Sequence, residues 1–208
     1  MKDGTDLHGC RVIEYYTRRL QQYGPEPRAV DWGSPQSQVL RFSVLCEIGS
    51  LAGASILDVG CGLGDLYGYL RTAGINVDYT GYDITPALLE AARRRFPEGR
   101  FLERNIADLP EADLEPGWDY VIASGIFYLR QQDPDAYLRE MVGRLSRLAR
   151  RGVAFNTLSA GASERSAGEY YADPTMVVGA CLDLTPRVVL RHDYMPHDFT
   201  VYLYPATA

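Results

Sequence analysis

Glycines recur at alternate positions in the segment Ile56–Leu66, which reads ILDVGCGLGDL. They follow a short apolar run, and such glycines let a chain turn tightly, approach a ligand closely and aim the free N–H groups of the next helix at it. The dinucleotide-binding fingerprint needs its last glycine at the position of Asp65. This carboxylate stands where a pyrophosphate would lie, so the segment favours a ligand with a smaller anion and a positive charge.

Polar residues close or follow the next three strand-like runs. Asp83 lies near the end of the second run, 19 residues after Gly64, Asn105 lies near the end of the third run, and Ser124 follows the fourth. Open α/β folds bind ligands at the carboxyl ends of their parallel strands. We therefore expect Ser124 to lie at the ligand-binding end of the sheet.

These features resemble the class I S-adenosylmethionine (SAM)-dependent methyltransferases. The resemblance rests on the glycine segment, Asp83, the run Arg104–Pro110 (RNIADLP) and the segment Asp119–Tyr128 (DYVIASGIFY). It covers Ser55 to Leu158, and a terminal hairpin extends it to the end of the chain. It implies SAM as the cofactor, with contacts at Asp58, Gly60, Cys61, Gly62, Gly64, Asp83, Ile84, Asn105, Ile106 and Ser124.

The resemblance also implies a role for each part of the site. The glycine backbone would hold the methionine part of SAM, with Asp58 bracing the turn. Asp83 would accept hydrogen bonds from both ribose hydroxyls, since a carboxylate has two acceptor oxygens. Many relatives carry Asp where this chain has Asn105, whose amide oxygen can still accept a hydrogen bond from the adenine amine. Ser124 would lie beside the sulfonium, and Cys61 reads as a packing residue rather than a nucleophile.

The substrate side is less standardised, so the sequence leaves alternatives open there. Arg41 lies on an apolar helical stripe and is either an anchor for a carboxylate of SAM or substrate, or half of a structural ion pair. Trp32 is either a lid over the cofactor or a packing residue. A metal site is not expected, and the identity of the catalytic base stays open. The candidates for catalysis are Asp31, Tyr128, Tyr170, Tyr171 and His192.

The composition excludes several chemistries. Of 21 Lys and Arg residues only Lys2 is a lysine, which removes a Walker A loop and a Schiff-base mechanism. A net charge of −6 argues against nucleic acid as the substrate. Four scattered cysteines fit neither a zinc ribbon nor a disulfide scaffold. Without a stretch of about 20 apolar residues or a signal-peptide core, no membrane span is expected and a cytoplasmic location is favoured.

Strand-like and helical runs alternate along the centre of the chain. Strands are predicted at Ser55–Val59, Val77–Ile84, Arg100–Ile106, Trp118–Ala123 and Gly152–Leu158, with a terminal hairpin of Val188–Tyr194 and Phe199–Tyr204. This rhythm predicts an α/β fold with a doubly wound, mostly parallel seven-stranded sheet and an antiparallel terminal strand. Two N-terminal helices, His8–Tyr23 and Ser37–Leu51, precede it. Residues 1–208 are expected to form a single domain, with 1–53 as a helical cap and 54–208 as the SAM-binding core.

The favoured function is methyl transfer from SAM to a small molecule in bacterial secondary metabolism. Two alternatives stay open. One is a non-methylating reaction, such as a cyclisation or elimination in natural-product biosynthesis, that keeps SAM as a structural element. The other is a SAM-binding auxiliary subunit of such an enzyme. A homo- or hetero-dimer is also left open.

Overall fold

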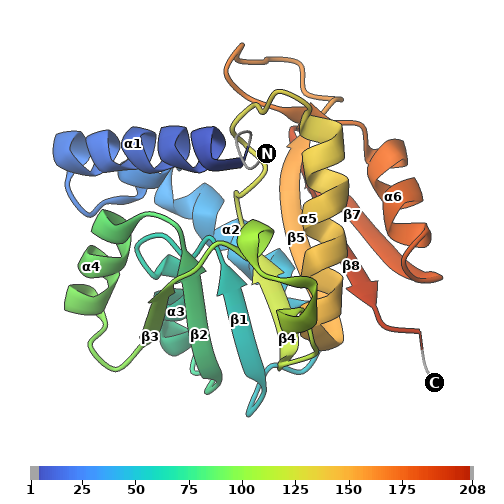
Figure 1. The fold of residues 1–208 in the computed structure, drawn as a ribbon, viewed down its shortest axis with the longest axis horizontal. Helices are drawn as coiled ribbons and strands as arrows, with labels where there is room; N and C mark the ends of the chain where they lie inside the picture. Colours follow the sequence, from blue (N-terminus) through green and yellow to red (C-terminus); the bar gives the residue numbers. More distant parts are fainter. Residues whose placement is uncertain (1–4, 207–208) are drawn as a thin grey trace.

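The computed structural model describes residues 5–206, and the side chains of residues 9–206, so Lys2 lies outside it. One sheet runs through the molecule with helices on both of its faces (Figure 1). In chain order the elements are α1 Thr5–Tyr23, η1 Pro27–Val30, α2 Pro35–Cys46, β1 Ser55–Val59, α3 Asp65–Thr72, β2 Asp78–Asp83, α4 Pro86–Arg95, β3 Arg100–Glu103, η2 Ile106–Asp108, η3 Glu111–Asp113, β4 Trp118–Ala123, α5 Pro134–Leu148, β5 Ala149–Ser159, β6 Tyr171–Ala172, α6 Pro174–Leu182, β7 Arg187–Met195 and β8 Asp198–Tyr204.

The strand order across the sheet is β3-β2-β1-β4-β5-β8-β7, and the short β6 pairs with the end of β5. Strands β1 to β5 pair in parallel, whereas β8 runs antiparallel to both β5 and β7. The expected doubly wound sheet with an antiparallel terminal strand is therefore confirmed, with β6 as an eighth strand. Since the chain continues from β1 to β2 on one side and to β4 on the other, the carboxyl end of β1 is a topological switch point, where such sheets bind ligands.

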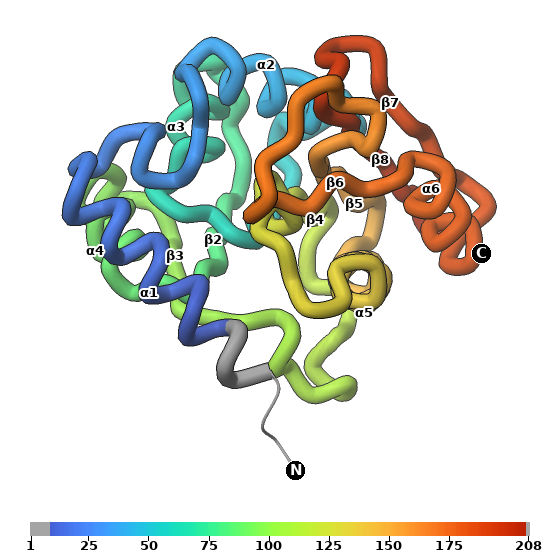
Figure 2. Tube along the Cα trace, turned by 90° about the horizontal axis from the view of Figure 1, so that it is seen from above, coloured from blue at the N-terminus to red at the C-terminus, as the bar shows by residue number. Residues whose placement is uncertain are grey.

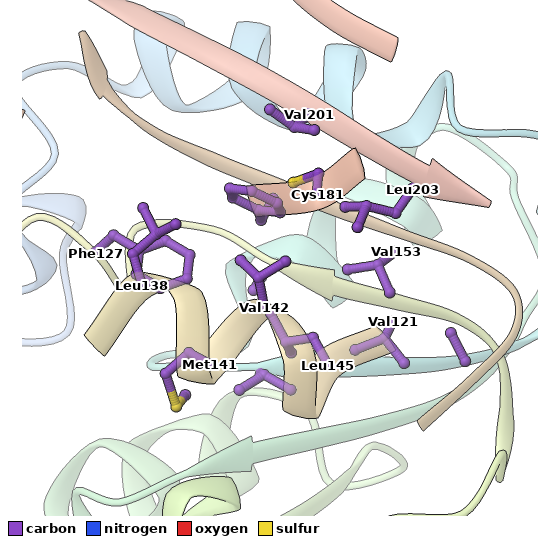
Figure 3. Close-up of a cluster of buried hydrophobic side chains, with 14 of the residues drawn as sticks. Val121, Phe127, Leu138, Met141, Val142, Leu145, Val153, Cys181, Val201 and Leu203 are labelled. Atoms are coloured by element: carbon purple, nitrogen blue, oxygen red, sulfur yellow. The ribbon is translucent and has the colours of Figure 1, made fainter. Parts of the chain in front are cut away.

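Helices α5 and α6 cover one face of the sheet. Figure 3 shows Leu138, Val142 and Leu145 of α5 beside Val121 of β4 and Val153 of β5, and all five side chains are buried. They recur at helical spacing because one stripe of α5 faces the strands. Burying a side chain of this size contributes roughly 1.5–3 kcal/mol, so this layer fixes the strands that carry the site.

Helices α2 and α3 cover the opposite face (Figure 2). Side chains alternate along a strand, so Ile122 and Ala154 point to this second core while their neighbours point to the first. Leu45 of α2 and Leu70 of α3 are fully buried against them. Helix α2 begins at a side-chain cap, because Ser34 accepts a hydrogen bond from the Ser37 N–H, at 3.1 Å.

Helix α1 lies across the carboxyl ends of the first strands and beside α4 (Figures 1 and 2). Tyr16 and Leu20 pack in a small third core with Ala29 of η1, Leu63 after β1 and Leu88 of α4. The N-terminal helices therefore close one side of the region where the predicted site residues gather.

Several elements differ from the sequence-based expectation. The second helix ends at Cys46 rather than Leu51, β3 ends at Glu103 rather than Ile106, and β5 begins at Ala149 rather than Gly152. Helix α6 was not expected, because its sequence PTMVVGACL is apolar nearly all round and shows no helical period. Within residues 5–206, no helix is both long and apolar enough to cross a membrane.

Candidate active site

The glycine turn after β1 is built from left-handed backbone. Gly60, Gly62 and Gly64 have φ values of +76°, +52° and +75°, a region that other residues rarely adopt. The N–H groups of Gly60 and Cys61 donate to the carbonyl of Tyr82 on β2, at 2.8 and 3.0 Å. A Cβ on Gly60 would collide with Ile126, which follows β4. The turn is thus tightly packed between the ends of the neighbouring strands β2 and β4.

Cys61 is a buried packing residue of this turn. A Cβ built on Gly81 of β2 would lie 2.8 Å from its Sγ, so strand and turn touch at this point. Burial, together with the negative charges of Asp83 and Asp58, raises the pKa of the Cys61 thiol well above its ordinary value. The thiol stays protonated at neutral pH, which makes it a poor nucleophile.

Asp58 lies beneath the turn and forms a hydrogen bond that the sequence did not predict. Its Oδ2 accepts a hydrogen bond of 2.6 Å from the hydroxyl of Tyr79 on β2. The side chain is buried, and burial raises the pKa of Asp58 to about 7. Nothing in the spacing of these two residues predicts the pair, because it forms only when β1 and β2 lie side by side.

Asp83 connects two turns at the end of β2. Its Oδ2 accepts from the Gly62 N–H and its Oδ1 from the Thr85 N–H, both at 2.8 Å. Burial raises the pKa of this carboxyl, while the backbone N–H groups oppose the shift. Each carboxylate oxygen keeps a second lone-pair site, so Asp83 can still accept two ligand hydroxyls.

Asn105 is held in place by its own neighbours. Its Oδ1 accepts from the Ala107 N–H at 3.1 Å and caps η2, while its Nδ2 donates to Asp108 at 2.8 Å. The amide orientation is therefore fixed, and the second lone pair of Oδ1 stays available for a ligand. At the end of β4, Ser124 has a buried hydroxyl with no protein partner. Such an orphaned group points to a polar ligand atom beside it.

These residues line one cavity of about 1110 Å³, which includes its open mouth. Val12 and Tyr16 of α1 form part of its wall opposite the strand ends. The predicted residues that line it are Asp58, Gly60, Cys61, Gly62, Asp83, Ile84, Asn105, Ile106, Ser124, Trp32 and Tyr128. Gly64 lies just behind the wall, where it caps α3.

Arg41 does not line the cavity. It forms a buried ion pair in which its Nε lies 2.8 Å from Oδ2 of Asp198, the first residue of β8. The two side chains are 6% and 0% exposed. Of the two alternatives for Arg41, the structure shows the ion pair, because the nearest carboxylate comes from the hairpin that packs beside α2.

The same carboxylate binds Tyr128. The Tyr128 hydroxyl donates to Asp198 Oδ2 at 2.7 Å, and the hydroxyl of Tyr194 on β7 donates to Oδ1 at 2.6 Å. Burial and then the charge of Asp198 raise the pKa of Tyr128 well above its ordinary value, so the phenol stays protonated. Trp32 packs edge to face against the Tyr128 ring, with centroids 5.9 Å apart. Sequence reasoning missed Asp198 because it lies far along the chain from both Arg41 and Tyr128, at the start of β8.

The other catalytic candidates also lie outside the cavity wall. Asp31 has left-handed backbone and forms an ion pair with Arg19 at 2.8 Å. The hydroxyls of Tyr170 and Tyr171 donate to the carboxylates of Asp135 and Glu169. His192 packs its ring against Phe199. Each was singled out by its residue type in a loop or hairpin, and each already contacts another side chain of the protein. Within residues 5–206, no cluster of three or more His, Cys, Asp or Glu is suited to a metal.

A parallel sheet with a glycine turn at its switch point, and a carboxylate at the end of the adjacent strand, defines a site for a nucleoside-containing cofactor. The sequence profile of the methyltransferase domain family matches residues 57–152. The putative methyltransferase Rv1506c of Mycobacterium tuberculosis is 37% identical over 160 residues, which are 74% of this chain and 94% of that protein. The chain therefore belongs to the class I SAM-dependent methyltransferases.

Two further comparisons support the fold and the family. A malonyl-acyl-carrier protein O-methyltransferase of Pectobacterium atrosepticum is 37% identical over 114 residues, covering 53% of this chain and 41% of that protein. The crystal structure of magnesium protoporphyrin IX methyltransferase from Synechocystis, with bound S-adenosylhomocysteine (SAH), superposes with a TM-score of 0.67 at 16% identity. It covers 95% of this chain and 99% of that one.

Proposed function

We propose that this methyltransferase binds SAM in the cavity over the glycine turn and transfers its methyl group to a small molecule. The observation that carries the proposal is the convergence of Asp83, Asn105 and Ser124 around Gly60 and Gly62 in one cavity. Each of the three polar side chains keeps an unused hydrogen-bonding site there, as a polar cofactor requires.

SAM supplies a methyl group on a positively charged sulfur. The residues of this chain hold and orient it: the glycine turn suits the methionine part, Asp83 the ribose hydroxyls, and Asn105 the adenine amine. Asp58 and Asp83 place negative charge beneath the turn, which favours a cationic ligand. Alignment of nucleophile, methyl carbon and sulfur supplies much of the rate enhancement for such a transfer. A protein base is required only if the nucleophile arrives protonated.

We further propose that residues 1–53 act as a cap on the SAM-binding core, residues 54–208. Val12 and Tyr16 of α1, with Val30 and Trp32 of the connector, line the same cavity as the strand ends, which supports this division. A cytoplasmic enzyme of bacterial secondary metabolism is the setting that we propose.

The test is a coupled assay for SAH release with purified protein, SAM and a broad panel of small acceptors. We expect SAH and a methylated product in equal amounts. A product that forms while SAM is unconsumed would select a non-methylating reaction instead. Activity that appears only after a second protein is added would favour an auxiliary subunit.

A further inference from the structure

Helix α1 carries a hydroxyl group into the cavity wall that the proposed function does not use. It belongs to Tyr16, which lines the cavity together with Val12 of the same helix. Figures 1 and 2 show α1 lying across the carboxyl ends of the first strands and beside α4. Tyr16 therefore reaches the site from the cap, opposite the residues that the strand ends supply.

The Tyr16 hydroxyl is open to a ligand. Within residues 9–206 it forms no hydrogen bond, unlike the hydroxyl of its neighbour Tyr15, which donates to Asp31 at 3.1 Å. It is also not among the side-chain atoms that are sealed from solvent without a partner. The ring packs against the third core while the oxygen keeps accessible surface. The hydroxyl is therefore the part of Tyr16 that remains available for a hydrogen bond.

The packing of Tyr16 places it near Asp83. Leu63 of the third core directly follows Gly62, and the Gly62 N–H donates to Asp83 Oδ2 at 2.8 Å. The negative charge of Asp83 is accordingly among those that act on the Tyr16 phenol. Both side chains line the same cavity. One comes from the cap and the other from the end of β2, so a ligand bound over Asp83 lies between them.

Tyr16 and Asp83 offer complementary hydrogen-bonding sites. Burial raises the pKa of the Tyr16 phenol, and the charges of Asp31 and Asp83 raise it further, so the hydroxyl keeps its proton at neutral pH. Tyr16 can therefore donate a hydrogen bond, whereas an ionised carboxylate can only accept. A donor and an acceptor on two sides of one space suit a ligand hydroxyl, which donates one hydrogen bond and can accept another.

We propose that Tyr16 is a cofactor-binding residue, which donates its hydroxyl proton to a ribose hydroxyl oxygen of SAM while Asp83 accepts the proton of the sugar. The inference rests on the proposed function, and only on its binding step. Hydrogen bonds to an ionised acceptor are stronger than those to a neutral one. The sugar protons therefore point to Asp83, and the lone pairs of the sugar oxygens are left for a donor such as Tyr16.

The experiment combines one substitution in the protein with one in the ligand. Kd is measured by titration calorimetry for SAH, for 5′-methylthioadenosine, and for the 2′-deoxy and 3′-deoxy analogues of SAH. Tyr16→Phe keeps the ring and should raise the Kd for SAH by about threefold to tenfold, the effect of one neutral hydrogen bond. The same factor is expected for 5′-methylthioadenosine, which keeps the sugar and lacks the amino-acid part. For one of the two deoxy analogues, wild type and variant should bind equally, because the oxygen that Tyr16 contacts is gone.

Tyr23→Phe is the matched control. Tyr23 is the last residue of α1 and packs against the same third core, but it does not line the cavity. Removing its hydroxyl should leave the Kd for SAH unchanged. A loss of affinity as large as that of Tyr16→Phe would show that the packing of α1 causes both effects, and the assignment of Tyr16 to the sugar would fall.

The remaining outcomes separate this inference from the proposed function. Unchanged SAH affinity in Tyr16→Phe, or an equal loss for SAH and both deoxy analogues, would overturn the inference and leave the proposed function standing. A loss that is seen with SAH but not with 5′-methylthioadenosine would place Tyr16 at the amino-acid part and also overturn it. If the wild type binds neither SAM nor SAH, the proposed function fails and the inference fails with it.

Discussion

A charged side chain near the site can bind a ligand only with the hydrogen-bonding sites and the charge that its protein partners leave unused. Asp83 uses one lone pair of each carboxylate oxygen for the backbone and keeps the others, whereas Arg41 has its charge balanced by Asp198. Both residues are charged, and both were candidates for binding the cofactor, with a structural ion pair as the alternative for Arg41. The hydrogen bonds and ion pairs that each residue forms within the protein decide whether its side chain can still bind a ligand.

Removing the Asp83 carboxylate should weaken SAM binding. Asp83→Ala leaves the ribose hydroxyls without acceptors, and the expected loss is about 1–3 kcal/mol by titration calorimetry. Asp78→Ala, at the exposed start of the same strand, is the matched control and should bind SAM normally. Unchanged SAM affinity in Asp83→Ala would contradict the assignment of this residue to the ribose.

Asp58 should make SAM binding depend on pH. Its pKa is raised to about 7 by burial, so below pH 7 a proton must leave before the carboxylate can balance a cationic ligand. SAM affinity should therefore rise between pH 6 and pH 8, by at most about tenfold per pH unit. Asp58→Asn should flatten this dependence, measured by calorimetry across the same range. If the SAM affinity of the wild type varied with pH as little as that of Asp58→Asn, Asp58 would not be the group that causes the pH dependence.

The same group changes the stability of the ligand-free protein with pH. Because the folded pKa lies above the ordinary carboxyl value of about 4, the contribution of Asp58 to the free energy of unfolding is fully present below pH 4. It is lost as the pH rises through about 7. The difference between wild type and Asp58→Asn isolates this contribution from that of Asp83, whose pKa is also raised.

At the scale of elements, the glycine turn shows how strand pairing constrains a loop. Gly53 and Gly60 both have φ of +76°, yet a Cβ on Gly53 would meet nothing within 4 Å while one on Gly60 would collide with Ile126. The backbone requirement is the same at both positions. The crowding at Gly60 exists only because β1 and β4 are neighbours.

This contrast gives a matched pair of substitutions. Gly53→Ala should lower the free energy of unfolding by about 1–2 kcal/mol, the cost of a left-handed non-glycine residue. Gly60→Ala should cost more and should also weaken SAM binding, since the collision shifts the turn. Urea denaturation measures the first effect and calorimetry the second. Adding Ile126→Ala should recover part of the loss, and equal costs for the two single variants would contradict the steric explanation.

At the scale of the whole molecule, the ion pair between Arg41 and Asp198 joins segments 157 residues apart. It connects α2 to the terminal hairpin and fixes Tyr128 after β4 through the same carboxylate. A buried pair of this kind links the N-terminal helices, strand β8 and the cavity wall in one arrangement. An exposed pair such as Arg94 with Glu90, at 65% and 70% exposure, links nothing beyond its own helix.

Breaking the buried pair should therefore be costly. Arg41→Met leaves Asp198 uncompensated and should lower the free energy of unfolding by about 3–5 kcal/mol. Arg94→Met should change it by less than about 1 kcal/mol. The double variant Arg41→Met with Asp198→Asn should be more stable than the sum of the two single effects predicts. Strict additivity in urea denaturation would show that the two residues do not depend on each other.

The sequence by itself determined the features that depend on local spacing. The glycine turn, the acidic residue at the end of β2 and the alternation of strands and helices are visible because backbone conformation and amphipathic periods leave a mark in neighbouring residues. They were enough to predict the doubly wound sheet and its antiparallel terminal strand, and the family resemblance that they carry implied the cofactor class. Helix α6 was not predicted, because an apolar helix with no polar stripe has no visible period.

The tertiary structure alone decided which side chains meet. Tyr79 with Asp58, and Arg41 and Tyr128 with Asp198, are contacts between segments distant in the chain, and residue type or spacing gives no signal for them. The partners also decide the chemistry, because a charge or a hydroxyl proton that is already engaged is no longer available to a ligand. The part of the site that would bind the cofactor could therefore be predicted from the sequence, whereas the surroundings of the acceptor could be described only from the tertiary structure.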